Sequence, residues 1–169
     1  MMMCPPQDPL HKVEIQFPVG DQTVSDLFHQ KLQESESVIH CIQCAQDFNQ
    51  REKLQFIDVS DILIISVQRT VYDQQKNQDR KITLPLNIGG DLDFKLPDGD
   101  TARFKLISGI EHQGSVNDPQ DPRGGHFVNH LSHQQRTLVI NQNSKIILSK
   151  GMQDCQVLFY QRIHDENYS

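Results

Sequence analysis

The stretch ILIISVQ, residues 62–68, decides the fold that this sequence can adopt. Residues 62 to 67 are apolar except for one serine, and most of them are β-branched. A short, near-continuous apolar run of this kind is typical of a central strand buried on both faces. We therefore expect this stretch at the centre of a sheet, with the other strands arranged around it.

Shorter segments on both sides of this stretch predict further strands, because they alternate apolar and polar residues or are briefly apolar. Their ranges are 13–17, 52–58, 81–84, 92–96, 103–112, 126–131, 136–140, 145–148 and 156–162. One short helix is predicted after the N-cap candidate Thr23, because four apolar residues fall on one helical face: Val24, Leu27, Phe28 and Leu32. The polar stretches 73–80 and 113–125 are expected to be exposed loops. The predicted fold class is β-rich α+β.

The composition of the chain limits the classes of partner that can be expected. The chain has 169 residues, a formal net charge of -6 and only 36% hydrophobic residues. It contains no run of lysine and arginine, so nothing predicts a nucleic-acid partner. No apolar stretch is long enough to cross a bilayer, so no membrane partner is expected either. Four cysteines, two of them in a CxxC spacing, fit a reducing intracellular compartment, cytoplasm or nucleus, better than a disulfide framework.

The segment PRGGHFVNHL, residues 122–131, offers a candidate for chemistry. Two glycines precede His126, the first residue of a predicted strand, and histidine is the side chain that titrates near neutral pH. A histidine base needs a partner that fixes its ring. A hairpin of strands 126–131 and 136–141 would bring Asn141 beside it. Taken alone, this pattern also fits an ordinary surface histidine.

Seven segments in order carry a resemblance to one family. They are CIQC (41–44), ILIISVQR (62–69), RKITLPLNI (80–88), FKLISGIEHQG (104–114), GGHFVNHL (124–131), LVINQNSKI (138–146) and VLFYQR (157–162). Together they resemble the C-terminal half of the catalytic domain of the ubiquitin-specific proteases (USPs), which are papain-like cysteine peptidases with fingers, palm and thumb. The resemblance runs from about residue 13 to residue 162. It implies a fingers-and-palm antiparallel sheet without the N-terminal thumb.

The resemblance also implies roles for individual residues. His126 matches the general base that takes the proton of a cysteine thiol, and Asn141 matches the residue that orients this base. His112 matches the histidine that borders the groove for the ubiquitin C-terminal tail. Gly124 and Gly125 would let that tail approach the backbone. The implied partner is ubiquitin or a ubiquitinated protein, and the implied family activity is thiol-dependent deubiquitination.

The sequence departs from the family pattern at the nucleophile. Cys4 is followed by two prolines, without the helix or the oxyanion-hole donor that a reactive thiolate needs. Cys155 replaces a small residue of the last strand and is expected to be a buried core thiol. Phe127 replaces a tyrosine, and Gln142 stands where many members carry a second acidic residue. No nucleophilic cysteine is therefore identified.

Cys41 and Cys44 have the spacing of half a zinc site, but a tetrahedral site needs four ligands. His40 is adjacent, with its side chain expected to point away from the pair. We therefore expect no cofactor, with free thiols in a vestigial half-site. His130 and His133 could join His126 around a metal, although nothing in their spacing specifies one.

Residues 1–12 are expected to be a disordered N-terminus, residues 13–163 a partial USP domain, and residues 164–169 a tail. Two functions follow. In the first, the chain is a USP domain, or a fragment or split product of one, and is inactive alone because the cysteine box is absent. In the second, it is a non-catalytic ubiquitin-binding or scaffold module derived from a USP. An unrelated β-rich interaction domain remains a third option.

Overall fold

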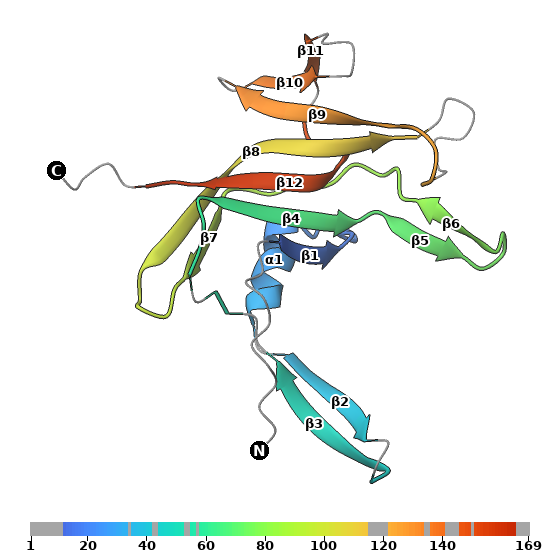
Figure 1. The fold of residues 1–169 in the computed structure, drawn as a ribbon, viewed down its shortest axis with the longest axis vertical. Coiled ribbons are helices and arrows are strands. Elements are labelled where there is room, and N and C mark those ends of the chain that lie inside the picture. Colours follow the sequence, from blue (N-terminus) through green and yellow to red (C-terminus); the bar gives the residue numbers. More distant parts are fainter. Residues whose placement is uncertain are drawn as a thin grey trace.

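The computed structural model describes residues 12–33, 35–41, 44–52, 55–56, 58–114, 122–133, 136–140, 146–149 and 151–164. Within them the main sheet has eight strands in the order β1-β4-β12-β8-β9-β10-β11, and β7 pairs with β8 beside this path. These strands are β1 (Lys12–Gln16), β4 (Ile62–Gln68), β7 (Leu92–Lys95), β8 (Thr101–Gln113), β9 (His126–His133), β10 (Arg136–Ile140), β11 (Ile146–Ser149) and β12 (Cys155–Arg162). The fold is β-rich α+β, as the sequence predicts (Figure 1).

The β4 strand lies between β1 and β12, which confirms its predicted place inside the sheet. Its pairing with β12 is antiparallel, but β1 runs parallel to it, so the expected antiparallel sheet is in fact mixed. Leu63, Ile65 and Val67 are buried, whereas Ile62 is 38% exposed. The prediction that this strand is buried on both faces is therefore wrong, because only one face is fully covered.

The covered face shares a buried core with the one helix of the described residues, α1 (Val24–Leu32), which contacts the neighbouring strand β1. Thr23 begins it with a capping box, in which its hydroxyl accepts from the Asp26 amide and the Asp26 carboxylate accepts from the Thr23 amide. Val24 and Phe28 are fully buried. The Phe28 ring lies 5.5 Å from that of Phe94, so the predicted helix and its apolar face are confirmed.

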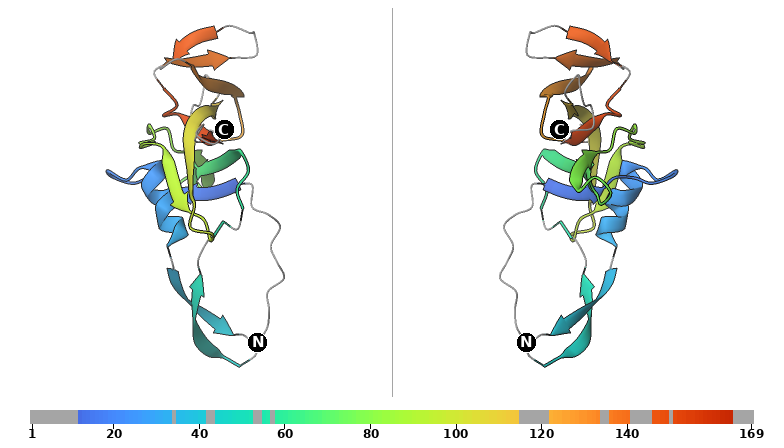
Figure 2. Two further views of the ribbon diagram at one scale, coloured as in Figure 1. Left: turned by 90° about the vertical axis from the view of Figure 1, so that its left-hand side faces the viewer. Right: turned by 90° about the vertical axis from the view of Figure 1, so that its right-hand side faces the viewer.

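Two hairpins extend from the sheet. The first consists of β2 (Ser35–Cys41) and β3 (Gln46–Glu52) and projects beyond α1, as Figures 1 and 2 show. The strand predicted at 52–58 is wrong, since residues 55, 56 and 58 are not in a strand. The hairpin's own residues are mostly exposed and polar, so no one-sided apolar alternation marked it. Across it Arg51 bonds Glu36 at 2.8 Å.

The second hairpin consists of β5 (Thr70–Asp73) and β6 (Gln78–Lys81), where the sequence predicts a loop at 73–80 and a strand at 81–84. Turn chemistry explains this correction. The Asp73 carboxylate accepts from the amides of Gln75 and Lys76, and Arg80 bonds it at 3.1 Å. These local hydrogen bonds hold the turn closed, and the hairpin therefore does not depend on an apolar face.

Arg69 joins this hairpin to the sheet. The residue is 3% exposed, and its guanidinium donates to four backbone carbonyls, those of Ile82, Leu84, Gln153 and Cys155, at 2.6–3.1 Å. The planar fork of arginine satisfies such a set of acceptors from one buried position. The segment between β6 and β7 and the start of β12 are thereby tied to the end of β4.

Candidate functional site

The candidate site lies at the end of the β8–β9 ladder. Gln113 pairs with His126, and His112 pairs with Phe127. Residues that pair directly share a sheet face, while successive residues alternate between faces. His126 therefore lies on the face of Gln113, and His112 lies on the opposite face with Phe127. The ladder brings the two predicted histidines to the same end of the sheet but on different faces.

His112 is a largely buried histidine, 7% exposed, against an exposed aromatic ring. Its ring centroid lies 5.0 Å from that of Phe127, which is 57% exposed. The Lys81 ammonium of β6 donates to the His112 carbonyl, and burial lowers the pKa of this ammonium. The β5–β6 hairpin is thus anchored at the end of the ladder. An exposed ring over a buried histidine forms a small apolar surface here.

Gly125 has an intrachain reason to be glycine. Its φ is +117°, a conformation that side-chain-bearing residues rarely adopt. A Cβ atom there would lie 1.9 Å from the carbonyl oxygen of Gln113. The chain therefore turns from the 122–125 segment into β9 against the backbone of β8. Contact of Gly124 or Gly125 with a ubiquitin tail stays a prediction.

The hairpin of β9 and β10 is antiparallel, as predicted, and its described register ends with Ile140 opposite Asn129. Asn141 lies outside the described residues, so the predicted approach of Asn141 to His126 stays a prediction. The His126 side chain is exposed. Among the described residues, none is hydrogen-bonded to its ring.

A group of polar residues that the sequence analysis did not bring together lies beside His126. The Nε2 atom of His130 is 2.8 Å from Oε2 of Glu111, and Gln113 donates to the same oxygen at 3.3 Å. His130 is 3% exposed. The bond to His130 lowers the pKa of the Glu111 carboxyl below its ordinary value. The alternation in GIEHQ and HFVNH could have placed these residues on one face, but only the register joins them.

Neither of the two described thiols, Cys155 and Cys44, is placed as a nucleophile for His126. Cys155 is fully buried, and burial raises the pKa of its thiol to about 12. A thiol with that pKa is protonated at neutral pH and is a poor nucleophile. Cys44 is exposed in the turn of the β2–β3 hairpin, remote from the β8–β9 end (Figure 1). Cys4 and the Cys41 side chain lie outside what the structure describes.

Metal ligands are not gathered in the described part of the chain, where no three His, Cys, Asp or Glu side chains are placed to hold an ion. His40 bonds Asp47 across the β2–β3 hairpin at 2.7 Å. His130 bonds Glu111, while the His133 side chain lies outside the description. The half-site at Cys41 and Cys44 stays a prediction.

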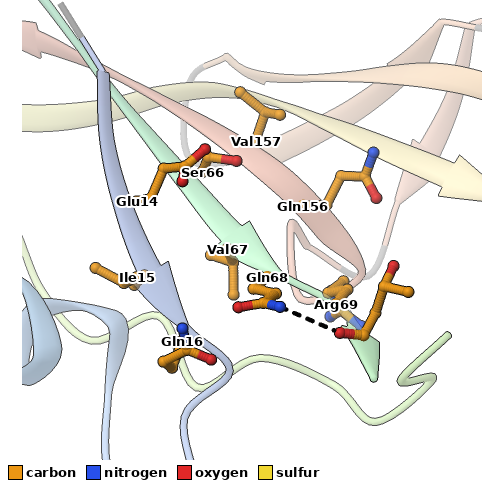
Figure 3. A pocket seen from close by; sticks show the side chains of 10 residues that line it. Glu14, Ile15, Gln16, Ser66, Val67, Gln68, Arg69, Gln156 and Val157 are labelled. Atoms are coloured by element: carbon orange, nitrogen blue, oxygen red, sulfur yellow. Dashed lines mark hydrogen bonds between the residues drawn. The ribbon is translucent and has the colours of Figure 1, made fainter. Parts of the chain in front are cut away.

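A separate hollow of about 440 Å³ lies where β1, β4 and β12 meet. Figure 3 shows the polar side chains that line it together with Val157, among them Glu14, Ser66 and Gln156. None of the residues predicted for chemistry lines it.

Among helices of the described residues, none is long and apolar enough to cross a membrane.

Comparison with solved structures gives a consistent answer about the fold. The SAGA Ubp8/Sgf11/Sus1/Sgf73 DUB module bound to ubiquitin aldehyde contains a chain that matches 90% of this chain with a TM-score of 0.62 and 14% identity. The module bound to monoubiquitin matches with a TM-score of 0.59 and 13% identity, and a yeast SAGA DUB module with 0.59 and 15%. This chain spans only about a third of those chains, 36% or 35% of their length.

These likenesses show a USP-like, papain-like fold for the chain. No family model and no curated protein matches the sequence. At 14% identity, similarity of fold does not carry activity with it. Function must therefore be argued from the site.

Proposed function

We propose that this chain is the palm-and-fingers part of a USP-like domain and that it binds the C-terminal tail of ubiquitin. The observation that carries the proposal is the match of 90% of the chain to a chain of a DUB module bound to ubiquitin aldehyde. The β8–β9 end offers features that suit a tail: the exposed Phe127 ring and the turn at Gly125. The partner would be ubiquitin or a ubiquitinated protein inside the cell.

Within this proposal His126 is the general base of a thiol-dependent site and Asn141 is the residue that orients it. An imidazole takes the thiol proton when its second ring nitrogen is held by an acceptor, which fixes the tautomer. The exposed position of His126 leaves its ring accessible to a thiol that approaches this end of the sheet.

A second function, a non-catalytic ubiquitin-binding module, is favoured by one observation. Neither described thiol suits a nucleophile for His126, because Cys155 is buried with a raised pKa and Cys44 lies on the distant hairpin. The two functions share the binding step. They differ in whether a thiolate reaches His126.

Titration of ¹⁵N-labelled ubiquitin with the chain, followed by NMR, tests the binding step. We expect the resonances of the ubiquitin tail to shift, and Phe127→Ser to weaken the shifts because it removes the exposed ring. Val19→Ser removes another exposed apolar side chain, 75% exposed and outside the β8–β9 ladder, and should leave them unchanged. Absence of tail shifts at millimolar chain would contradict the proposal.

A further inference from the structure

We propose that the face of the main sheet opposite α1, called here the second face, is a docking surface for a second copy of this chain. The isolated protein then forms a dimer. The proposal goes beyond the proposed function, because it needs neither ubiquitin nor a thiolate. It also accounts for the near-continuous apolar run 62–67, of which the structure fully covers only one face.

The strand register aligns two rows of side chains across the second face, because residues that pair directly share a face. The first row crosses β4, β12, β8, β9 and β10 and consists of Ile64, Phe159, Ser108, Leu131 and Leu138. The second row crosses the same strands and consists of Ser66, Val157, Ile110, Asn129 and Ile140. Figure 3 shows Ser66 and Val157 side by side on β4 and β12. The two rows are apolar apart from two serines and one asparagine, and no row residue is charged.

The described part of the chain leaves these rows without a cover. The core cluster that includes the α1 side chains contains Leu63, Ile65 and Leu158, which alternate with row residues along β4 and β12. Among the described residues, that cluster and the side chains packed against it include no member of the two rows. Leu131 is 38% exposed, and Phe159 is half-buried. A sheet face in water normally carries polar side chains, so an apolar face of this kind indicates a protein partner.

The distribution of charge favours a second copy as that partner. The chain carries a formal net charge of -6, so two copies repel each other unless their contact is free of charge. The two rows provide such a contact, and a two-fold axis sets them against the same rows of the copy. Charged side chains begin only outside the rows, with Lys12 and Glu14 on β1 and Lys105 on β8. An uncharged centre inside a polar rim is the usual anatomy of an interface.

The size of the second face sets the expected strength of the dimer. Five neighbouring strands about 4.8 Å apart, with rows about 6.6 Å apart from Ile62 to Phe127, give a flat area of about 600 Å². Standard interfaces bury about 800 Å² on each partner, and smaller ones belong to weaker complexes. We therefore expect a reversible dimer with a micromolar dissociation constant. Phe127 lies at the margin of the second face, whereas His126 lies on the opposite face and stays open.

Analytical ultracentrifugation of the unaltered chain, from nanomolar to several hundred micromolar, tests the proposal. The monomer mass is 19.5 kDa, and the average mass should rise towards twice this value as the concentration passes through the micromolar range. The measurement is made without ubiquitin, so its outcome does not depend on the proposed function.

Leu131→Glu and Ile62→Glu place a carboxylate on the second face at positions that are each 38% exposed in the single chain. Burial of an unpaired carboxylate in the dimer is costly, so each change should raise the dissociation constant by at least about tenfold. Ile39→Glu is the matched control, because it makes the same change at a 45% exposed isoleucine of the β2–β3 hairpin. It should leave the dissociation constant unchanged. Circular dichroism shows whether each variant is folded.

NMR of a mixture of isotope-labelled and unlabelled chains locates the contact independently of any variant. Intermolecular contacts should join the Phe159 ring to the methyl groups of the two rows. A chain that stays monomeric at several hundred micromolar would overturn the proposal. Particles that keep growing with concentration would do so too, because a closed two-fold contact stops at the dimer. A dimer that Ile39→Glu weakens, and that folded Leu131→Glu and Ile62→Glu leave intact, would show a different interface and would equally overturn it.

Discussion

The Nε2 atom of His130 on β9 lies 2.8 Å from Oε2 of Glu111 on the neighbouring strand β8, and both side chains are largely buried. Removal of charged groups from water is costly unless each is paired, and this pair also takes a bond from Gln113. Lys81 and Arg69 add charges around it. The pair therefore links the stability of this end of the sheet to pH.

Glu111→Gln should lower the free energy of unfolding near pH 7 by about 1.5–3 kcal/mol, the weight of hydrogen bonds to a charged group. The folded pKa of this carboxyl lies below its ordinary value of 4.5. Its contribution is therefore present above that value and is lost as the pH falls through the folded pKa. Denaturant unfolding between pH 7 and pH 3 should show the two proteins converging at the acid end.

Glu14→Gln is the matched control, because Glu14 pairs with Lys12 at 2.8 Å on the exposed edge strand β1. Exposed pairs are screened by solvent, so this change should be undetectable in the same experiment. A constant difference between Glu111→Gln and the unaltered chain at all pH values would contradict the linkage.

Arg69→Lys should lower the free energy of unfolding by about 1–3 kcal/mol for each buried carbonyl that is left without a donor. Lysine keeps the charge but cannot serve four carbonyls from the guanidinium's position. Denaturant unfolding measures the loss. Arg51→Lys, at an exposed ion pair with Glu36, should change stability by no more than about 1 kcal/mol, and equal effects would contradict the role of Arg69.

The strands that carry one-sided apolar alternation were predictable from the sequence. The β8 strand shows such a pattern, whereas β4 and β10 were predicted from short apolar runs and α1 from a capping residue and a helical apolar face. The β2–β3 hairpin has no buried face in its described part, so periodicity carries no signal for it. The turn of β5–β6 depends on Asp73, whose bonds to two amides are visible only in the structure.

For the candidate site, the sequence analysis proposed His126 from its Gly-Gly-His pattern and His112 from the family resemblance, but not their arrangement. Their separate faces follow from the register Gln113–His126, which depends on how Gly125 packs against β8. A shift of one residue would exchange the faces. The Glu111–His130 pair was missed for the same reason, since its members are 19 residues apart.

Gly125→Ala should disturb the β8–β9 end and lower stability by more than the conformational strain alone. That strain is about 1–2 kcal/mol for a residue forced to positive φ. The added Cβ would also lie 1.9 Å from the Gln113 carbonyl oxygen, so the backbone must move. Gly99→Ala is the control, with φ +95° and no atom within 4 Å of the new Cβ. Equal losses of unfolding free energy for the two variants would contradict the close approach.

The chain should hold no stoichiometric zinc tightly. Cys41 and Cys44 supply two ligands where a structural site needs four. The neighbouring His40 is bonded to Asp47 at 2.7 Å. Elemental analysis of protein purified without chelator measures the content directly. One zinc per chain, lost on Cys44→Ser but not on Cys155→Ser, would contradict the half-site and indicate further ligands.

The isolated 169-residue chain should neither cleave a ubiquitin C-terminal fluorogenic amide nor react with a ubiquitin-based thiol-reactive probe. Hydrolysis by this chemistry needs a thiolate, a base and an oxyanion hole together, and removal of the nucleophile costs most of the acceleration. Cys155 is protonated at neutral pH because burial raises the pKa of its thiol to about 12. Cys44 lies on the β2–β3 hairpin, away from the strand that carries His126.

A water activated by His126 would not replace the thiol, because water forms no acyl-enzyme that divides the reaction into two easier steps. Probe labelling followed by mass spectrometry checks the prediction, with Cys4→Ala, Cys41→Ala, Cys44→Ala and Cys155→Ala made singly to identify any thiol that reacts. Labelling that is lost in Cys4→Ala, together with turnover that is lost in His126→Ala, would show that the chain holds a complete site. Ubiquitin binding without either signal is the expected result, because the tail can bind beside a base that has no thiolate to activate.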